Sequence, residues 1–218
     1  MEGVLGLRFV LATANLGKIG EMREILSGYG VEVVTRDELG ISIDVEETGT
    51  TFLENARIKA LAICAQAGMP AIADDSGLVV DALGGKPGVY TSSFGGEGLT
   101  ARERCEYLMN VMEKMEQRRA KFVCTIVCAF PNGDLLTSTG ECHGAISMRL
   151  AGSMGFGYDP VFIPDGLSKT MAELSSDEKN AISHRSKALR NFSELLRTSN
   201  LKSHAMGDES GVCPSGAG

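Results

Sequence analysis

Apolar positions follow two different periods along the chain, and together they predict a fold of mixed strands and helices. Short, nearly continuous apolar runs are typical of buried strands, and they cover residues 8–13, 31–35, 70–73 and 78–83. Apolar side chains three or four positions apart are typical of amphipathic helices, and they cover residues 19–26, 51–66, 100–117 and 184–196. Segments 121–130 and 135–149 flank a Pro-Asn-Gly-Asp turn, which predicts a long antiparallel hairpin.

Strands alternate with helices over most of the chain, and the hairpin adds antiparallel pairing. We therefore expect an α/β fold with a mixed sheet and helices on both faces. With 218 residues the chain is long enough for one sizeable core or two lobes of one domain, which we place at 1–198. The segment 199–218 is rich in Ser, Gly and Asp without an apolar period, so we expect a disordered tail there.

The charge balance narrows the classes of partner. With 21 basic and 28 acidic residues the net charge is −7, which argues against broad binding to nucleic acid or anionic membranes. The sequence has no apolar run approaching the roughly 18 residues of a membrane span and no signal-peptide pattern, so we expect a cytoplasmic protein. Six cysteines without the spacing of a zinc site are expected to be reduced, mostly buried thiols.

Two adjacent acids, Asp74 and Asp75, followed by Ser76, stand where the run 70–73 is expected to give way to a turn. Ionised carboxylates there are costly unless they meet water, a cation or hydrogen-bond donors. Their oxygens suit Mg²⁺, which usually combines one or two carboxylates with waters and substrate phosphates. The alternative is an Asx turn before Gly77, and the pentapeptide taken alone favours that alternative.

Basic groups stand at two expected helix starts. Asn15 is a suitable N-cap, and the free N–H groups of the turn after it form a ready anion site beside Lys18. The glycine spacing does not make a Walker loop, so this motif alone is a weak signal. His184 and Arg185 follow Ser183, the expected cap of the last helix. Cations are unfavourable at that end of the helix dipole, and an anionic ligand would remove the conflict.

Two further features have a structural and a functional interpretation. Gly155-Phe156-Gly157 permits close backbone approach to a flat ligand, although a tight turn with a buried Phe is commoner. Lys59 lies off the apolar stripe of its helix, and helical spacing alone favours a solvated lysine. The turn 13–18, the acids 74–76 and the basic group at 179–185 nevertheless all lie where open α/β sheets bind ligands. Together they supply carboxylates for Mg²⁺ and cations for phosphates, which phosphoryl chemistry requires.

The chain resembles the inosine triphosphate pyrophosphatase family, which hydrolyses the noncanonical purine nucleotides dITP, ITP and XTP to the monophosphate and pyrophosphate. Five blocks carry the resemblance in order over about 190 residues: LATANLGKIGEMREIL, EETGTTFLENARIKA, AIADDSGLVVDALGGKPGVY, GFGYDPVF and KTMAELSSDEKNAISHRSKAL. The resemblance implies an α/β fold of two lobes with a long, twisted mixed sheet, a nucleotide cleft between the lobes, a homodimer and a Mg²⁺ requirement. It also implies that water attacks the α-phosphorus and that the reaction cleanses the nucleotide pool of these noncanonical nucleotides.

Carried over by position, the resemblance assigns roles to residues of this chain. The triphosphate would bind at Thr13, Ala14, Asn15, Leu16, Gly17 and Lys18. Glu46 and Asp75 would hold Mg²⁺, Asp75 would also accept the proton of the attacking water, and Ser76 would contact the substrate. The base and sugar would lie against Phe156, Gly157, Tyr158 and Asp159. Lys179, His184 and Arg185 would reach the base and phosphates, and Lys59 would also face the cleft.

The assignment to Asp75 carries a condition, because neighbouring residues of an extended strand point to opposite sides. We expect Asp75 to be the metal ligand and base and Asp74 to be a hydrogen-bonded support. A structure in which Asp74, and not Asp75, faces Lys18 and Arg185 would reverse that assignment.

The chain departs from the family pattern, and other functions compete with this one. Ser93 stands where many relatives carry an Arg, Phe94 where a Tyr is common, and Met154 where a Gly is frequent. A cleft-side cation is therefore expected to be missing. The rival enzyme is a Maf-like pyrophosphatase that prefers canonical or modified pyrimidine nucleotides. The competing function of a different class is that of a nucleotide-binding module without catalysis. The intact acids argue against it.

Overall fold

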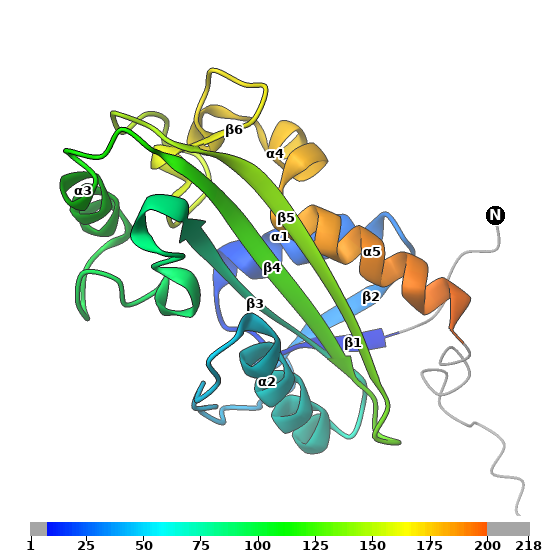
Figure 1. The fold of residues 1–218 in the computed structure, drawn as a ribbon. Helices are drawn as coiled ribbons and strands as arrows, with labels where there is room; N and C mark the ends of the chain where they lie inside the picture. The colour runs from blue at the N-terminus through cyan, green and yellow to red at the C-terminus, as the bar shows by residue number, and fades with distance from the viewer. Residues whose placement is uncertain (1–7, 200–218) are drawn as a thin grey trace, which may run out of the picture.

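The computed structural model describes residues 8–199, which form a single six-stranded sheet with helices packed on it (Figure 1). The strands are β1 (Arg8–Leu11), β2 (Glu32–Thr35), β3 (Ala71–Val80), β4 (Arg119–Ala129), β5 (Leu135–Ile146) and β6 (Phe162–Pro164). The α-helices are α1 (Leu16–Ser27), α2 (Phe52–Ala67), α3 (Ala101–Val111), α4 (Ser176–Ile182) and α5 (His184–Thr198). The tail expected at 199–218 lies outside the described residues except for Ser199.

The sheet is mixed, as the sequence predicts, and its strand order is β2-β1-β3-β4-β5-β6. β1 pairs in parallel with both β2 and β3, whereas β3, β4, β5 and β6 pair in antiparallel fashion. The carboxyl ends of β1 and β2 therefore lie side by side at one edge of the sheet. In α/β sheets that edge is where ligands bind.

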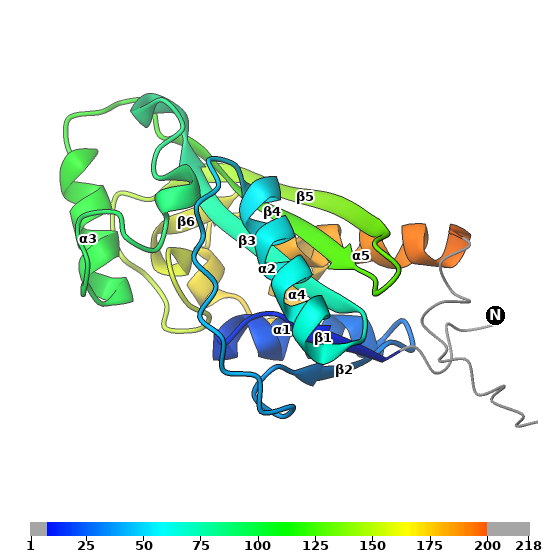
Figure 2. The same cartoon turned by 90° about the horizontal axis from the view of Figure 1, so that it is seen from below.

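Helices cover both faces of the sheet, and alternation along β4 shows which face each helix covers (Figures 1 and 2). Cys124, Ile126 and Cys128 point into one core with α1 and α5, whereas Val127 and Ala129 point into another with α2. A third core lies under α3 and β6, at the other end of the long hairpin. Burial of these apolar faces, at roughly 25 cal/mol per Å², is the main force that holds the helices on the sheet.

The helix caps agree with the sequence prediction. Asn15 and Ser183 cap α1 and α5, and Thr51 and Thr100 form capping boxes with Glu54 and Glu103 at the starts of α2 and α3. Each cap supplies an acceptor for an otherwise unpaired N–H of the first turn. The predicted strand at 31–35 and the hairpin are also confirmed, although β5 ends three residues before position 149.

The predicted turn at Asp74–Gly77 is wrong, because β3 runs without interruption from Ala71 to Val80. The whole strand pairs with β4, so the backbone groups of the acidic segment are satisfied by the ladder. Residues 81–83, expected to continue a second strand, form a 3₁₀ turn that ends at Gly84 in the left-handed conformation. The acids therefore lie in the middle of a strand, not at its end.

Helix α3 is shorter than the predicted segment 100–117, since it ends at Val111. The guanidinium of Arg118 donates to the carbonyl of Met112 at 3.0 Å and to that of Ile146 at 2.7 Å, which turns the chain from the helix end into β4. Within residues 8–199, no helix is long and apolar enough to cross a membrane. The five cysteines in this range are free and buried, as expected.

Candidate active site

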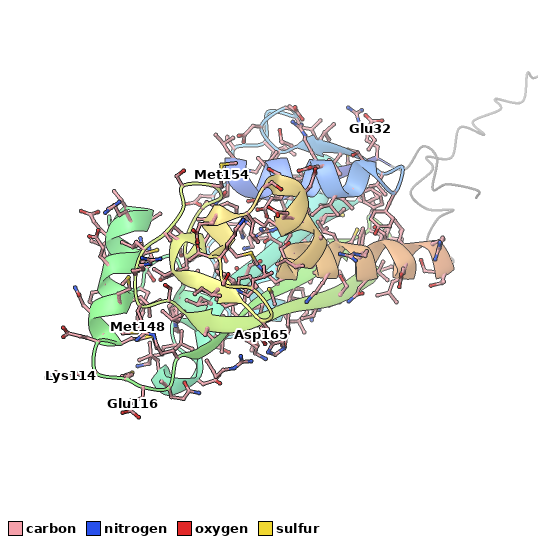
Figure 3. All side chains as sticks on the ribbon, turned by 90° about the horizontal axis from the view of Figure 1, so that it is seen from above. Glu32, Lys114, Glu116, Met148, Met154 and Asp165 are labelled. Atoms are coloured by element: carbon pink, nitrogen blue, oxygen red, sulfur yellow. The ribbon has the colours of Figure 1, made fainter. Side chains whose placement is uncertain are left out.

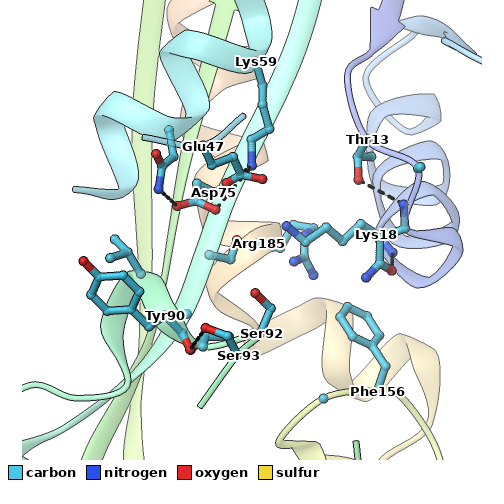
Figure 4. A pocket seen from close by; sticks show the side chains of 18 of the residues that line it. Thr13, Lys18, Glu47, Lys59, Asp75, Tyr90, Ser92, Ser93, Phe156 and Arg185 are labelled. Carbon is cyan, nitrogen blue, oxygen red and sulfur yellow. Dashed lines mark hydrogen bonds and ion pairs between the residues drawn. The ribbon is translucent and has the colours of Figure 1, made fainter. Parts of the chain in front are cut away.

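A cleft of about 820 Å³ opens beside β3 and is lined by segments from across the chain (Figure 4). Its walls include the turn after β1, the residue after β2, the segment before α2 and α2 itself, the middle of β3, the loop after β3, α3, the loop before β6, α4 and the start of α5. Thr13 and Lys18 lie on one side of the cleft, Lys59, Glu47 and Asp75 lie on the other, and Arg185 lies between them (Figure 4).

Asp74 points to the face of β3 that carries Lys18 and Arg185. Its Oδ2 atom lies 3.0 Å from Nζ of Lys18 and 3.3 Å from a guanidinium nitrogen of Arg185, and it accepts a hydrogen bond of 2.8 Å from the Ser76 hydroxyl. Burial opposes ionisation here, yet Lys18 and Arg185 hold the pKa of the Asp74 carboxyl well below its usual range. Asp74 therefore stays ionised and fixes two cations.

Asp75 points to the opposite face of β3 and lines the cleft. Lys59 Nζ lies 3.3 Å from Oδ1 of Asp75 and 2.9 Å from Oε2 of Glu47, and the Asn55 amide donates to Oδ2 of Asp75 at 3.4 Å. Burial raises the pKa of Asp75 above that of an ordinary aspartate, and the charge of Lys59 opposes this effect. The solvated position that spacing alone favoured for Lys59 is wrong, because its side chain is only 12% exposed and lines the cleft.

The structure meets the condition stated for reversing the roles of the two acids, because Asp74 and not Asp75 faces Lys18 and Arg185. Taken literally, this outcome moves the roles of metal ligand and base to Asp74. The side chain of Asp74 is fully buried and engaged by two cations, however, and it is not among the residues that line the cleft. Asp75 is the acid that a ligand can reach. Because both faces of β3 carry cations, contact with Lys18 and Arg185 does not identify the acid that faces the substrate.

The turn after β1 has the geometry of an anion site. Thr13 Oγ1 accepts from the backbone N–H of Asn15 at 3.2 Å, and Asn15 Oδ1 accepts from that of Lys18 at 3.1 Å. Thr13, Ala14, Asn15 and Lys18 line the cleft. Leu16 is 82% exposed and Gly17 lies against the Phe156 ring, so neither is among the lining residues. A Cβ atom on Gly17 would come within 2.7 Å of that ring, which explains the glycine.

The Phe156–Asp159 loop is bound to the basic side of the cleft. Asp159 accepts a hydrogen bond from the backbone N–H of Phe156 at 2.9 Å and one from Lys179 at 2.6 Å. Lys179 and Arg185 lie over the Phe156 ring, 4.8 and 5.5 Å from its centroid. Glycines 155 and 157 both have positive φ, which gives the tight turn. Tyr158 is nearly buried, and its hydroxyl donates to the carbonyl of Thr91 at 3.1 Å.

The start of α5 does not carry the two unpaired cations that the sequence suggested. Burial lowers the pKa of His184 well below its usual value, so the imidazole is neutral; it stacks on Phe122 with 4.7 Å between ring centroids. Its Nδ1 atom has no hydrogen-bond partner within residues 8–199. Arg185 is paired with Glu21 and Asp74, and Glu21 also lies 2.7 Å from Lys179. Acids of the protein, rather than a ligand, therefore resolve the conflict with the helix dipole.

Of the two predicted metal ligands, only one lines the cleft. Asp75 lines the cleft, whereas Glu46 is exposed and is not among the lining residues; its neighbour Glu47 is. No group of three or more His, Cys, Asp or Glu side chains in the described part of the chain is arranged to hold a metal ion. Ser76 also lines the cleft.

Several cleft residues were missed in the sequence. Asn55, Glu47, Arg36 and Arg104 line the cleft, and none of them belongs to a motif with assigned chemistry. Arg104 donates to the carbonyls of Phe94, Gly96 and Leu99 and so holds the loop 94–99. Only the fold shows that these segments meet.

The positions that depart from the family pattern are partly in the cleft. Ser93 lines it, and Phe94 packs edge-on against Tyr107 with 5.3 Å between ring centroids. Met154 lies at the surface on the loop before Gly155, with its side chain 53% exposed (Figure 3). It lines a smaller neighbouring pocket, not the main cleft.

Comparisons with family models, with known sequences and with solved structures each find a match over most of the chain. The model of the Ham1 family matches residues 9–195. A dITP/XTP pyrophosphatase of Aquifex aeolicus is 46% identical over 200 residues, which cover 88% of this chain and 97% of that protein. One of Bacillus subtilis is 44% identical over 189 residues, covering 86% and 96%. The structure of a HAM1 protein from Coxiella burnetii matches with a TM-score of 0.81 at 40% identity, covering 88% of this chain and all of the other.

Proposed function

The chain belongs to the Ham1 family, and we propose that it hydrolyses noncanonical purine nucleoside triphosphates such as dITP and XTP to the monophosphate and pyrophosphate. The observation that carries the proposal is near-complete coverage of dITP/XTP pyrophosphatases at about 45% identity. The cleft supports it, because cations and carboxylates from separate segments and from both faces of β3 converge there. Since one fold can host several chemistries, the function also has to agree with the residues of the site.

We place the triphosphate along the turn 13–18. The first-turn N–H groups of α1 and the ammonium of Lys18 offer positive charge beside the carboxyl end of β1. Asp74 holds Lys18 in position from beneath, so this cation pays little conformational entropy when it binds a phosphate. Leu16 and Gly17 contribute backbone rather than side-chain groups to this proposal.

Mg²⁺ fits the opposite wall of the cleft. The ammonium of Lys59 lies between carboxylates of Asp75 and Glu47, which supports a position for positive charge at this spot. Two carboxylates are what Mg²⁺ takes in nucleotide sites, where waters and phosphates complete its shell. We propose Asp75 with Glu47 as the protein ligands; Glu46, the predicted ligand, is the adjacent alternative. When bound, the metal would neutralise phosphate charge at the reacting phosphorus.

Asp75 is the proposed proton acceptor. Its raised pKa makes it a stronger base than an ordinary aspartate, and it faces the cleft, where Asn55 and Lys59 orient its two oxygens. In this position the carboxylate would hold a water by hydrogen bonding and take its proton as the water oxygen attacks the α-phosphorus. The bond to the bridging oxygen then breaks, and pyrophosphate leaves with that oxygen.

The base is proposed to lie at the Phe156–Asp159 loop. The Phe156 ring offers a stacking face with Lys179 and Arg185 over it, and neutral His184 also lines the cleft, so hydrogen-bond donors are at hand. A 6-oxo purine presents an acceptor to such donors, whereas the amino group of adenine would leave buried donors unpaired. We also propose that the two ends of the sheet act as lobes around the nucleotide, and that the protein is a homodimer, as the resemblance implies.

Product identification tests the reaction. With dITP and Mg²⁺ in water enriched in ¹⁸O, we expect pyrophosphate and labelled dIMP, because water attacks the α-phosphorus. Release of orthophosphate and dIDP would show a different phosphatase and would contradict the proposal. Removal of Mg²⁺ by a chelator is a separate test. It is expected to abolish turnover while the circular dichroism spectrum of the folded protein stays unchanged. Sedimentation velocity tests the homodimer.

A further inference from the structure

Arg36 lines the cleft directly after β2, and the function proposed above gives it no role. Its backbone N–H donates to the carbonyl of Leu11 at 3.3 Å, so it lies beside the end of β1, from which the turn 13–18 departs. The carboxyl ends of two parallel strands thus bring Arg36 next to the turn at which we place the triphosphate.

The guanidinium of Arg36 has unused hydrogen-bonding capacity. Its Nε–H is buried and has no hydrogen-bond partner within residues 8–199. The side-chain hydrogen bond found for it runs from a terminal nitrogen to the carbonyl of Ile43, at 3.1 Å. An arginine has five N–H donors, and a buried donor without an acceptor is unfavourable unless a ligand supplies one.

The charge of Arg36 is also less neutralised than the charges of Lys18 and Lys59, which lie on the two sides of the cleft. Lys18 and Lys59 each lie within 3.3 Å of a carboxylate that is itself at least 89% buried. The acid nearest to Arg36 is Asp37, whose Oδ1 lies 3.5 Å from Nε and whose side chain is 67% exposed. Exposed pairs at such distances contribute little. Arg36 therefore presents positive charge and a free donor together.

We propose that Arg36 is a further substrate-binding residue that contacts the β- and γ-phosphates, the part of the substrate that leaves as pyrophosphate. The planar guanidinium matches phosphate oxygens and binds them with two parallel hydrogen bonds. β2 lies at the opposite edge of the sheet from β6, which follows the base-binding loop. Arg36 belongs to the part of the cleft beside the turn 13–18, where we place the triphosphate.

Product inhibition tests the proposal, which rests on the function proposed above. For Arg36→Gln we expect the inhibition constant of inorganic pyrophosphate, with Mg²⁺ present, to rise roughly 10- to 100-fold, the range for a lost charged hydrogen bond. The inhibition constant of IMP, which lacks those phosphates, is expected to stay within about twofold of wild type. Arg36→Lys keeps the charge without the planar pair of donors and is expected to fall between the two.

Arg23→Gln is the matched control. Arg23 binds Glu38 with both contacts at 2.6 Å, and Glu38 accepts from the backbone N–H of Thr35 at 2.7 Å, so this pair anchors the same turn. Arg23 does not line the cleft. Its variant is expected to keep wild-type inhibition by pyrophosphate. An equal effect of both variants, or equal weakening of pyrophosphate and IMP by Arg36→Gln, would assign Arg36 a structural role and overturn the proposal.

Failure of the proposed function is distinguishable from failure of this inference. If the wild-type protein releases no pyrophosphate from dITP or XTP, the function is wrong. Calorimetric titration of inorganic pyrophosphate into wild type and Arg36→Gln then still measures the contact without turnover. Equal pyrophosphate affinity of the two proteins would overturn the role of Arg36.

Discussion

At the scale of single residues, the two adjacent acids of β3 point to opposite faces, and we therefore expect them to have different tasks. We expect Asp75→Asn to lower kcat by roughly 10²- to 10⁴-fold, the usual contribution of a general base. Binding of ITP is expected to remain measurable by calorimetry, since the phosphate and base contacts are intact. Asp81→Asn, at an exposed position just after the same strand, serves as the control. Near-normal turnover of Asp75→Asn would remove Asp75 from the mechanism.

We expect Asp74 to contribute mainly to the free energy of unfolding. Asp74→Asn leaves Lys18 and Arg185 without their shared buried partner, and breaking a buried pair typically costs about 3–5 kcal/mol. Because the pKa of Asp74 is lowered on folding, its contribution is complete above the unfolded-state value of about 3.9. It is lost as the pH falls from there toward the folded-state pKa.

Urea unfolding of wild type and Asp74→Asn at several pH values measures this contribution. We expect the gap in unfolding free energy to be constant from pH 7 to about 5 and to shrink below about 4. A gap under about 1 kcal/mol at pH 7, or one that widens in acid, would contradict the assignment of Asp74 as an ionised anchor.

At the scale of elements, periodicity and caps were predictable, whereas the course of β3 was not. Asn15, Thr51, Thr100 and Ser183 act locally, within one helical turn, so the sequence contains the whole signal. The segment Asp74–Gly77 looks like a turn because its own residues favour one. Its extended form depends on β4, about 50 residues later, and on cations from both faces. Tertiary partners therefore override the local preference.

Gly77 shows the same dependence on tertiary structure. A Cβ atom there would overlap the carbonyl oxygen of Gly88, because the loop after β3 packs directly against the strand. We expect Gly77→Ala to lower the unfolding free energy by about 1–3 kcal/mol, as overpacking usually does. Gly20→Ala, in α1 with nothing within 4 Å of the added carbon, is expected to stabilise by about 0.5–1 kcal/mol. Thermal unfolding of both variants checks this contrast, and equal effects would contradict it.

At the scale of the whole molecule, the cleft joins side chains that are far apart in the sequence. Motifs and the family resemblance identified most of the basic and acidic residues in it, including Lys18, Asp75 and Arg185. They could not give the pairing of Glu21 with Arg185, the position of Glu47 rather than Glu46 in the cleft wall, or the approach of Arg36 to the turn 13–18. Those contacts depend on how β1, β2, β3 and α5 are placed relative to one another.

The central claim is that this cleft selects and hydrolyses 6-oxo purine nucleoside triphosphates. Pyrophosphate release with Mg²⁺, measured across dITP, XTP, dGTP, dATP, dUTP and TTP, tests it most directly. We predict kcat/KM for dITP and XTP at least roughly 100-fold above the values for dATP, dUTP and TTP, because the base site relies on hydrogen bonds to the 6-oxo group. For dGTP, which has that group and a 2-amino group as well, we predict a value between the two sets. A preference for TTP or dUTP over dITP, or the absence of pyrophosphate release from every nucleotide, would contradict the claim.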